Sequence, residues 1–250
     1  MNEEEILASH FADLAAACYE KGIYTYTDFL GLAEQDVLLR AARDFSYVPY
    51  TVFGGTEGCE RVMVRFGDEE SLGYAADFPI ICLEIAPRSP KFAEPLCHRD
   101  CLGALMNLGV KRECLGDIAL REDGIFLFCT EKMAPYLCEN LTRVRHTDVR
   151  VAPCVPPAAV YQKTEEVRLS VASPRADGVV AHAYSLSRAD AADLFAARRV
   201  FINGRLCESG SRELRTGDTV TVRGSGRFRF GGEVGSSKKG KSIICIEKFV

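Results

Sequence analysis

Three arginines stand close together near the end of this 250-residue sequence, in the stretch TVRGSGRFRF that runs from Thr221 to Phe230. A guanidinium group is planar and permanently charged, and its donors match the oxygens of a phosphate. The glycines between the arginines let backbone approach a ligand closely. Arg223, Arg227 and Arg229 are therefore candidates for gripping a polyanion, although arginines on the outer side of a strand also keep an ordinary protein solvated.

The alternation along this stretch separates apolar side chains from charged ones. Val220 and Val222 point to one side of the expected strand, so Arg223 points to the other. After the Gly-Ser-Gly bend, the two phenylalanines share one side and the two later arginines share the opposite side. An expected helix upstream adds three cations, Arg188, Arg198 and Arg199. The pattern predicts a basic patch that spans a helix and a strand.

The charge of the chain is divided unevenly between its two ends. Residues 168–250 hold 15 Lys and Arg against 8 Asp and Glu, a net +7, whereas residues 1–167 hold 16 against 27, a net −11. The overall net charge of −4 therefore hides a basic C-terminal region that suits a polyanionic partner. Docking of the basic end on the acidic end of the same molecule is the alternative, and charge alone does not decide between them.

Composition indicates an ordinary globular protein of the cytoplasm. It is 47% hydrophobic and 26% charged, and its apolar runs fall short of the ~20 residues that span a bilayer. The acidic start, MNEEEILASHF, does not resemble a secretory signal. The eleven cysteines are scattered without a C-x-x-C pair, and the nearest approach to a metal cluster, Cys97, His98 and Cys101, lacks a fourth ligand. We expect free thiols, no metal, no cofactor and no membrane partner.

The first two thirds of the chain divide into two expected domains. In residues 1–73, periodicity predicts helices over 3–20 and 36–45 and strands over 48–53 and 61–66. In residues 74–153, the predicted elements follow the order β-α-β-β-α-β of the split βαβ fold, over 79–85, 98–108, 117–121, 125–129, 131–141 and 144–151. Phe126 and Phe128 share one face of a strand, where they are either core or a platform for stacking bases.

The third expected domain follows a break at residues 152–157, APCVPP, and covers 168–250. Ser173-Pro174 is expected to open one helix and Ser187, with Asp190 three residues later, to cap a second. Short strands follow around Asn203-Gly204 and over 219–223. The predicted fold class is α+β, with three small domains.

The C-terminal region resembles the S-four RNA-binding domain. The matching residues are Arg175 and Asp177, Ser187-Arg188, Leu194, Val200 to Asn203, and the run from Asp218 to Gly224. The resemblance implies RNA contacts by Arg175, Ser187, Arg188 and Asn203 together with the arginines already described. Two departures are Ala176, where the family usually has leucine, and Arg198, where it usually has glycine. Arginine there needs either another helix ending or about 1 kcal/mol of left-handed strain.

Three further blocks extend the resemblance over nearly the whole chain. FGGTEGCER, LCHRDCLGALMNLGVKRECLGDI and GSGRFRF followed by SSKKGKSIICIEK are similar to the YlmH family of bacterial RNA-binding proteins. That resemblance implies a ribosome or ribosomal subunit as partner, through ribosomal RNA or ribosome-bound tRNA, in the handling of stalled nascent chains. It adds Lys238 and Lys239 to the candidate RNA-binding residues, and Arg99, Lys111 and Arg112 of the middle domain join them as flanking cations.

Enzymes form the rival class. His98-Arg99-Asp100 lacks the other motifs of a kinase, and GGTEG is not followed by the Gly-Lys-Ser/Thr of a phosphate loop. We therefore assign no catalytic residue and expect a non-catalytic protein that binds structured RNA and not DNA. An RNA-modifying enzyme with its active site in the first 150 residues is the alternative, and an adaptor that docks through its acidic N-terminal domain is compatible with RNA binding.

Overall fold

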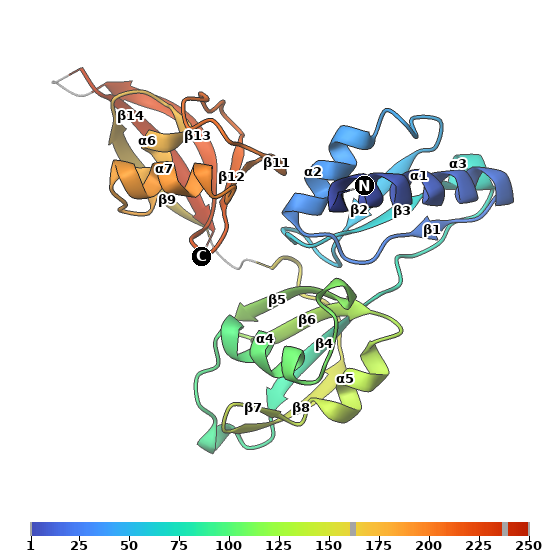
Figure 1. Ribbon diagram of the computed structural model, residues 1–250. Coiled ribbons are helices and arrows are strands. Elements are labelled where there is room, and N and C mark those ends of the chain that lie inside the picture. The colour runs from blue at the N-terminus through green and yellow to red at the C-terminus, as the bar shows by residue number, and fades with distance from the viewer. Residues whose placement is uncertain (1, 161–163, 237–239, 250) are drawn as a thin grey trace. The chain divides into compact units, whose positions relative to one another are not determined.

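The computed structural model describes residues 2–160, 164–236 and 240–249, and it divides into two compact units, Met1–Tyr161 and Gln162–Val250 (Figure 1). Both units combine helices with antiparallel sheets, in agreement with the predicted α+β class. The predicted domains 1–73 and 74–153 both fall within the first unit, so their independence stays a prediction.

The N-terminal part of the first unit packs two helices on a small sheet. Helix α1 (Glu3–Lys21) and helix α2 (Leu32–Ala41) share a core with a sheet of order β1-β3-β2, and a short α3 (Glu69–Leu72) follows. The strands are β1 (Thr25–Tyr26), β2 (Tyr50–Phe53) and β3 (Met63–Phe66). The predicted first helix is confirmed, with Asn2 and Glu5 forming a capping box. The second begins four residues earlier than predicted, because Gly31 is its N-cap.

The middle of the chain forms a five-stranded sheet of order β5-β6-β4-β8-β7. Its elements are β4 (Ile80–Pro87), α4 (His98–Asn107), β5 (Leu115–Arg121), β6 (Gly124–Thr130), α5 (Ala134–Asn140), β7 (Arg143–Val144) and β8 (Thr147–Pro153), with 3-10 turns at Pro90–Phe92 and Arg112–Cys114. The predicted split βαβ order is present. One long last strand was predicted wrongly, because the chain turns back at Arg145-His146 to make the β7–β8 hairpin.

The two faces of this sheet are both covered. Helices α4 and α5 pack on one face, with Leu83 and Leu127 in the shared core. On the other face Phe126 and Phe128 are buried with Phe29, which comes from the N-terminal segment. The two phenylalanines are therefore core residues, and they are covered where a base-stacking platform would need to be open.

A polar clamp joins the N-terminal segment to the same sheet. The Arg61 guanidinium donates to the carbonyl oxygens of Leu115 at 2.8 Å, Phe29 at 2.9 Å and Arg112 at 3.0 Å. The Asp117 carboxylate accepts from the backbone N–H of Arg61 at 3.2 Å, and burial raises the pKa of this carboxyl group. Buried polar groups that are paired in this way fix a register between the two halves of the unit.

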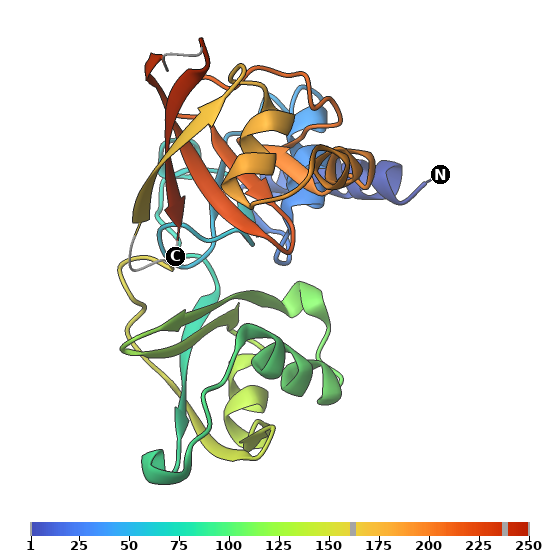
Figure 2. The ribbon, with the colours of Figure 1, turned by 90° about the vertical axis from the view of Figure 1, so that its left-hand side faces the viewer.

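The second unit is a six-stranded antiparallel sheet with two helices on one face (Figures 1 and 2). The sheet order is β11-β10-β12-β13-β14-β9. Its elements are β9 (Thr164–Val171), α6 (Ala176–Ala183), α7 (Arg188–Ala196), β10 (Val200–Ile202), β11 (Arg205–Leu206), β12 (Thr219–Val222), β13 (Gly226–Ser236) and β14 (Ser242–Phe249). The expected start of this domain, residue 168, lies inside β9, a strand that the sequence pattern did not predict.

One helix cap of this unit differs from its prediction and the other agrees. Ser173 was expected to cap α6, but the N-cap is Arg175. A loop supplies the missing acceptors, since the N–H groups of Ala176 and Asp177 donate to the carbonyls of Arg212 and Gly210 at 2.8 and 2.9 Å. The capping box of Ser187 with Asp190 at the start of α7 is confirmed.

Replacing Phe128 tests the packing that unites the first unit. Phe128 is fully buried between the sheet and the N-terminal segment, so Phe128→Ala should lower the free energy of unfolding by about 3–5 kcal/mol. Urea unfolding of the full chain, with hydrogen exchange to locate the loosened peptides, measures this change. Exchange should rise in residues 25–66 as well as in β6. Loosening confined to the middle sheet would contradict the packing, and Leu120→Ala on the same sheet, at an exposed position, is the matched control.

Candidate nucleic-acid interface

The start of α6 and the start of α7 frame a cavity of about 230 Å³ in the second unit. Arg175, His182 and Arg188 line it, together with Asp177. All three basic side chains are exposed. Two of the sequence-predicted residues, Arg175 and Arg188, are therefore brought together, and His182 is an additional polar group that the sequence reasoning missed.

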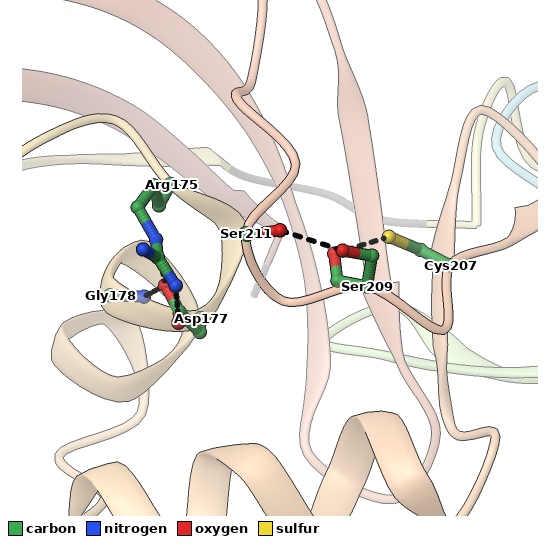
Figure 3. Close-up of polar contacts among 6 residues, drawn as sticks. All are labelled: Arg175, Asp177, Gly178, Cys207, Ser209 and Ser211. Carbon is green, nitrogen blue, oxygen red and sulfur yellow. Dashed lines mark hydrogen bonds and ion pairs between the residues drawn. The ribbon is translucent and has the colours of Figure 1, made fainter.

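Figure 3 shows the contact between Arg175, one of the cavity-lining residues, and Asp177. Its guanidinium forms a two-point ion pair with Asp177, at 3.2 and 2.7 Å, and this pairing raises the pKa of Arg175. The same carboxylate accepts from the N–H of Gly178 at 2.7 Å. Across from it, Ser209 bonds to Ser211 at 2.8 Å and accepts from the Cys207 thiol through its carbonyl, which orders the loop that caps α6.

The chemistry available in this cavity comes from side chains and not from free helix ends. The loop carbonyls already accept from the first N–H groups of α6, and Ser187 accepts from Asp190 at the start of α7. His182 donates through Nδ1 to the carbonyl of Gly178 at 2.8 Å, so Nε2 is the ring nitrogen that this bond does not use. Two guanidinium groups against one carboxylate give a small site that can pair with phosphate oxygens.

A second group of arginines lies at the far end of α7. The helix closes with the N–H of Arg198 bonded to the carbonyl of Phe195 at 3.0 Å and that of Arg199 bonded to Leu194 at 2.9 Å. These two backbone hydrogen bonds form a Schellman motif, in which Arg198 takes the left-handed conformation at φ 56°. Arg198 thus takes the ending that glycine would favour and carries the strain, while its side chain lies 3.5 Å from Glu208.

Arg199 links the end of α7 to the β12–β13 turn. Its guanidinium donates to the carbonyl of Arg223, and the N–H of Arg223 donates back to the carbonyl of Arg199 at 2.9 Å. A side chain on Gly224 would collide with this guanidinium, because an added Cβ would lie 2.4 Å from it. The space that this glycine was expected to leave for a phosphate is therefore filled by Arg199.

A third group lies on the sheet face that points away from the helices. Arg227 and Arg229 both stand over the ring of Phe249, at 5.2 and 5.8 Å, and Arg223 stands over the ring of Phe201 at 5.1 Å. Arg229 also lies 3.5 Å from the Glu247 carboxylate. Phe228 and Phe230 are buried on the helix side, so the predicted division of aromatic and basic faces is confirmed.

The arginines predicted as one patch lie at three places in the second unit. Helix α7 has 9 residues and is about 13 Å long, so Arg188 and Arg199 stand at opposite ends of it. The arginines of β13 face away from both helices. The last two places adjoin each other, because Arg199 and Arg223 are hydrogen-bonded.

Two of the remaining candidates of this unit, Ser187 and Asn203, make hydrogen bonds within the fold. The Ser187 hydroxyl is bonded to the Asp190 carboxylate at 2.7 Å. Asn203, left-handed at φ 53° in the confirmed tight turn, donates to Asp218 at 2.7 Å and accepts from the N–H of Thr219 at 2.9 Å. Lys238 and Lys239 lie outside the described residues. RNA contact by all four stays a prediction.

The three candidates of the first unit also separate. Arg112 is half-buried and donates to the carbonyls of Leu115 and Gly116; burial and the nearby Arg61 lower its pKa to about 10. Lys111 is exposed and lies 3.4 Å from Glu113. Arg99 is exposed on α4 and lines a different cavity with Arg143 and Arg145. The latter two arginines were not predicted, because the expected long strand concealed the β7–β8 turn.

The described part of the chain contains neither a metal-binding cluster nor a membrane-spanning helix. Among those residues, no group of three or more His, Cys, Asp or Glu side chains is placed to hold a metal ion. The helices within the described ranges are too short or too polar to cross a membrane. All eleven cysteines are free thiols, and burial raises the pKa of Cys101 to about 11 and that of Cys129 to about 12.

Comparison with known proteins finds a matching family model and a curated relative. Residues 74–155 match the family model described as "Putative RNA-binding domain in YlmH". A curated relative, "Ribosome-associated protein quality control protein P2" of Bacillus subtilis (strain 168), is 28% identical over 228 residues, which are 89% of this chain and 86% of the relative. Both matches agree with the resemblance to the YlmH family that the sequence shows.

A solved structure carries the same family name. The "Cell division protein ylmH from Streptococcus pneumoniae" is 19% identical to this chain, with a TM-score of 0.48, and the match covers 62% of this chain and 93% of the other. The matched region of the family model coincides with the five-stranded sheet of the first unit, from before β4 to just beyond β8. The resemblance noted in the sequence is therefore confirmed for the middle domain.

The left-handed conformation of Arg198 predicts an uncommon stabilising substitution. Arg198→Gly should raise the free energy of unfolding of the second unit by a few tenths to about 1 kcal/mol, because glycine relieves the strain but gains entropy in the unfolded chain. Denaturant unfolding measures it. Arg199→Gly is the neighbouring control and should destabilise, since the bond to the Arg223 carbonyl is lost. A destabilising Arg198→Gly would show that the pairing with Glu208 outweighs the backbone term.

Proposed function

We propose that this chain is a non-catalytic RNA-binding protein that associates with the ribosome. Its partner is structured RNA, either ribosomal RNA or ribosome-bound tRNA, and its task belongs to the quality control of translation. The relative named for ribosome-associated quality control and the matched RNA-binding domain support this function. A ribosome partner would place the protein in the cytoplasm.

The observation that carries the proposal is the cavity lined by Arg175 and Arg188. Two exposed guanidinium groups from different helices converge there, and one of them is held in place by a two-point ion pair. Preorganised arginines lose little side-chain entropy when they bind a phosphate. Residues 168–250 also carry a net charge of +7, which attracts polyanions before contact is made.

The mode of recognition follows from the position of these groups. A-form RNA presents phosphates and 2′-hydroxyls along a wide, shallow minor groove, and proteins that contact it there read shape more than sequence. The cavity arginines and the Arg198–Arg199 pair stand at the two ends of α7, about 13 Å of helix apart. That arrangement suits contact with successive phosphates along one RNA strand, with α7 lying along it.

Removing the two cavity arginines tests this interface. Arg175→Ala combined with Arg188→Ala should weaken binding of a fluorescein-labelled RNA hairpin about tenfold or more and reduce the salt dependence by about 0.7–0.9 per lost phosphate contact. Fluorescence anisotropy across a salt series measures both. The melting temperature should stay close to that of the unsubstituted chain, because the Arg175–Asp177 pair is exposed.

The matched control is Arg168→Ala. Arg168 is an exposed arginine on β9, and its neighbours Val167 and Leu169 face the helix-side core, so Arg168 points away from the cavity. It should leave both the affinity and the salt slope unchanged. If the control and the cavity variant lose the same RNA affinity, binding depends on overall charge and not on this cavity, and the proposed interface is wrong.

Migration in a sucrose gradient tests the ribosomal partner. At low salt the purified chain should move with a ribosomal subunit or with the whole ribosome, and the cavity variant should shift toward the top of the gradient. Raising the salt should release the unsubstituted protein, because displaced counterions drive binding to phosphates. Protein that stays at the top at every salt concentration, while it still binds the isolated hairpin, would contradict ribosome association.

A further inference from the structure

A second basic cavity lies in the first unit, outside the region that the S-four resemblance covers. It has a volume of about 560 Å³ and runs along one face of α4, between that helix and the segment from the end of α5 to the β7–β8 turn. The polar side chains that line this cavity, called here the α4 groove, include Arg99, Asn107, Asn140, Thr142, Arg143 and Arg145. Asp100 is the carboxylate among its lining residues, so three guanidinium groups face one negative charge.

The charges of the α4 groove are only weakly neutralised. Asp100 is engaged by the N–H of Cys97 at 2.9 Å, as part of the cap of α4, and lies 3.7 Å from Arg145. Arg143 lies 3.9 Å from Asp148, and both side chains are largely exposed, so this pair is weak. Arg99 has no hydrogen bond or ion pair to another residue within the described ranges. The groove therefore keeps a positive potential that a bound anion can use.

Two residues of the α4 groove, Gly103 and Arg145, are locally unfavourable for the backbone that they form. Gly103 stands inside α4, where glycine is worse than alanine, yet an added Cβ would meet nothing within 4 Å. Its missing side chain keeps the floor of the groove open. Arg145 is left-handed at φ 52°, a conformation that favours glycine or asparagine. Residues kept in costly conformations gather at functional sites, and here both line the same cavity.

The wall that carries Arg143 and Arg145 is anchored firmly. Leu141 and Val144 are buried in the core beneath it, and the N–H of Val149 donates to the carbonyl of Thr142 at 2.9 Å. Thr147, which is also buried, accepts from the N–H of Glu94 at 3.3 Å. These contacts fix the backbone from which Arg143 and Arg145 extend, and a supported backbone is one requirement of a preorganised binding site.

We propose that the α4 groove binds the sugar–phosphate backbone of RNA, as a contact region separate from the arginines of the second unit. Guanidinium groups pair with phosphate oxygens, while the amides of Asn107 and Asn140 and the hydroxyl of Thr142 match phosphate and 2′-hydroxyl groups. The groove has room at Gly103 for a backbone to lie close to the helix. This inference rests on the proposed RNA-binding function and extends it to Arg143 and Arg145.

Substitutions that leave the fold intact test the groove. Arg99→Ala with Arg145→Gly removes two charges and relieves the left-handed strain, so the melting temperature should be unchanged or rise by about 2–4 °C. Affinity of the full chain for purified ribosomal RNA should fall about tenfold or more, and the salt slope should fall by about 1.4–1.8. Arg150→Ala, an exposed arginine of β8 outside the groove, is the matched control and should change neither.

A steric variant separates the groove from a general effect of charge. Gly103→Leu fills the floor without altering any charge, and leucine is a good helix former, so stability should be kept while RNA affinity falls. Wild-type affinity in both groove variants would overturn the inference. Loss in the Arg175 and Arg188 variant alone would then leave the proposed function standing, whereas wild-type binding in every variant would remove both.

The same variants distinguish RNA from an acidic protein as the occupant. If the groove variants detach from whole ribosomes but bind purified ribosomal RNA with wild-type affinity and salt slope, the groove receives a ribosomal protein and the inference is wrong. If the groove variants bind both whole ribosomes and purified ribosomal RNA more weakly, with a reduced salt slope, the result supports RNA as the occupant of the groove.

Discussion

A β-sheet has two faces, and in each unit the helices cover only one face of the main sheet. The organisation of this molecule depends on what happens to the other face. In the first unit the N-terminal segment covers that face, and Phe128 and the Arg61–Asp117 clamp hold the segment in place. In the second unit the corresponding face carries Arg223, Arg227 and Arg229 over phenylalanine rings. Aromatic rings under guanidinium groups keep such a face soluble while retaining its positive charge. Burial of one sheet face and the placement of arginines on the other are two solutions to the same constraint.

The parts of the fold that could be predicted from the sequence are those that depend on neighbouring residues. Periodicity gave α1 and the split βαβ order, and the Ser187–Asp190 spacing gave the cap of α7, because each signal is local. The sequence pattern did not predict the β7–β8 hairpin, because its turn residues, Arg145-His146, include neither glycine nor asparagine. It misplaced the start of α6, because the acceptors that cap this helix come from a loop more than 30 residues later in the chain. Signals that depend on tertiary contacts are absent from any short window of sequence.

The candidate site shows the same limit. Period-two alternation correctly separated Phe228 from Arg229, but it could not show that the arginines of α7 and those of β13 lie on opposite sides of one sheet. Nor could residue type show that Arg199 fills the space beside Gly224 and that Arg112 is bonded within the fold. Conversely, Arg143 and Arg145 gave no signal, although the structure places them beside Arg99. Arginine marks a candidate contact, and only its hydrogen-bond partners show how much of its donor capacity is left for a ligand.

Two of the four left-handed residues other than glycine in the described ranges are arginines, Arg145 and Arg198, one in each unit. A left-handed turn selects glycine or asparagine on backbone grounds alone, as Asn203 shows. An arginine in that conformation costs about 1 kcal/mol, and neither ion pair repays much, because Asp100 and Glu208 lie 3.7 and 3.5 Å away beside exposed guanidinium groups. The turn also fixes where these side chains leave the backbone, so each guanidinium points from a tight loop toward solvent. Arg145 and Arg198 are thus two positions at which the side chain present is not the one that the backbone conformation favours.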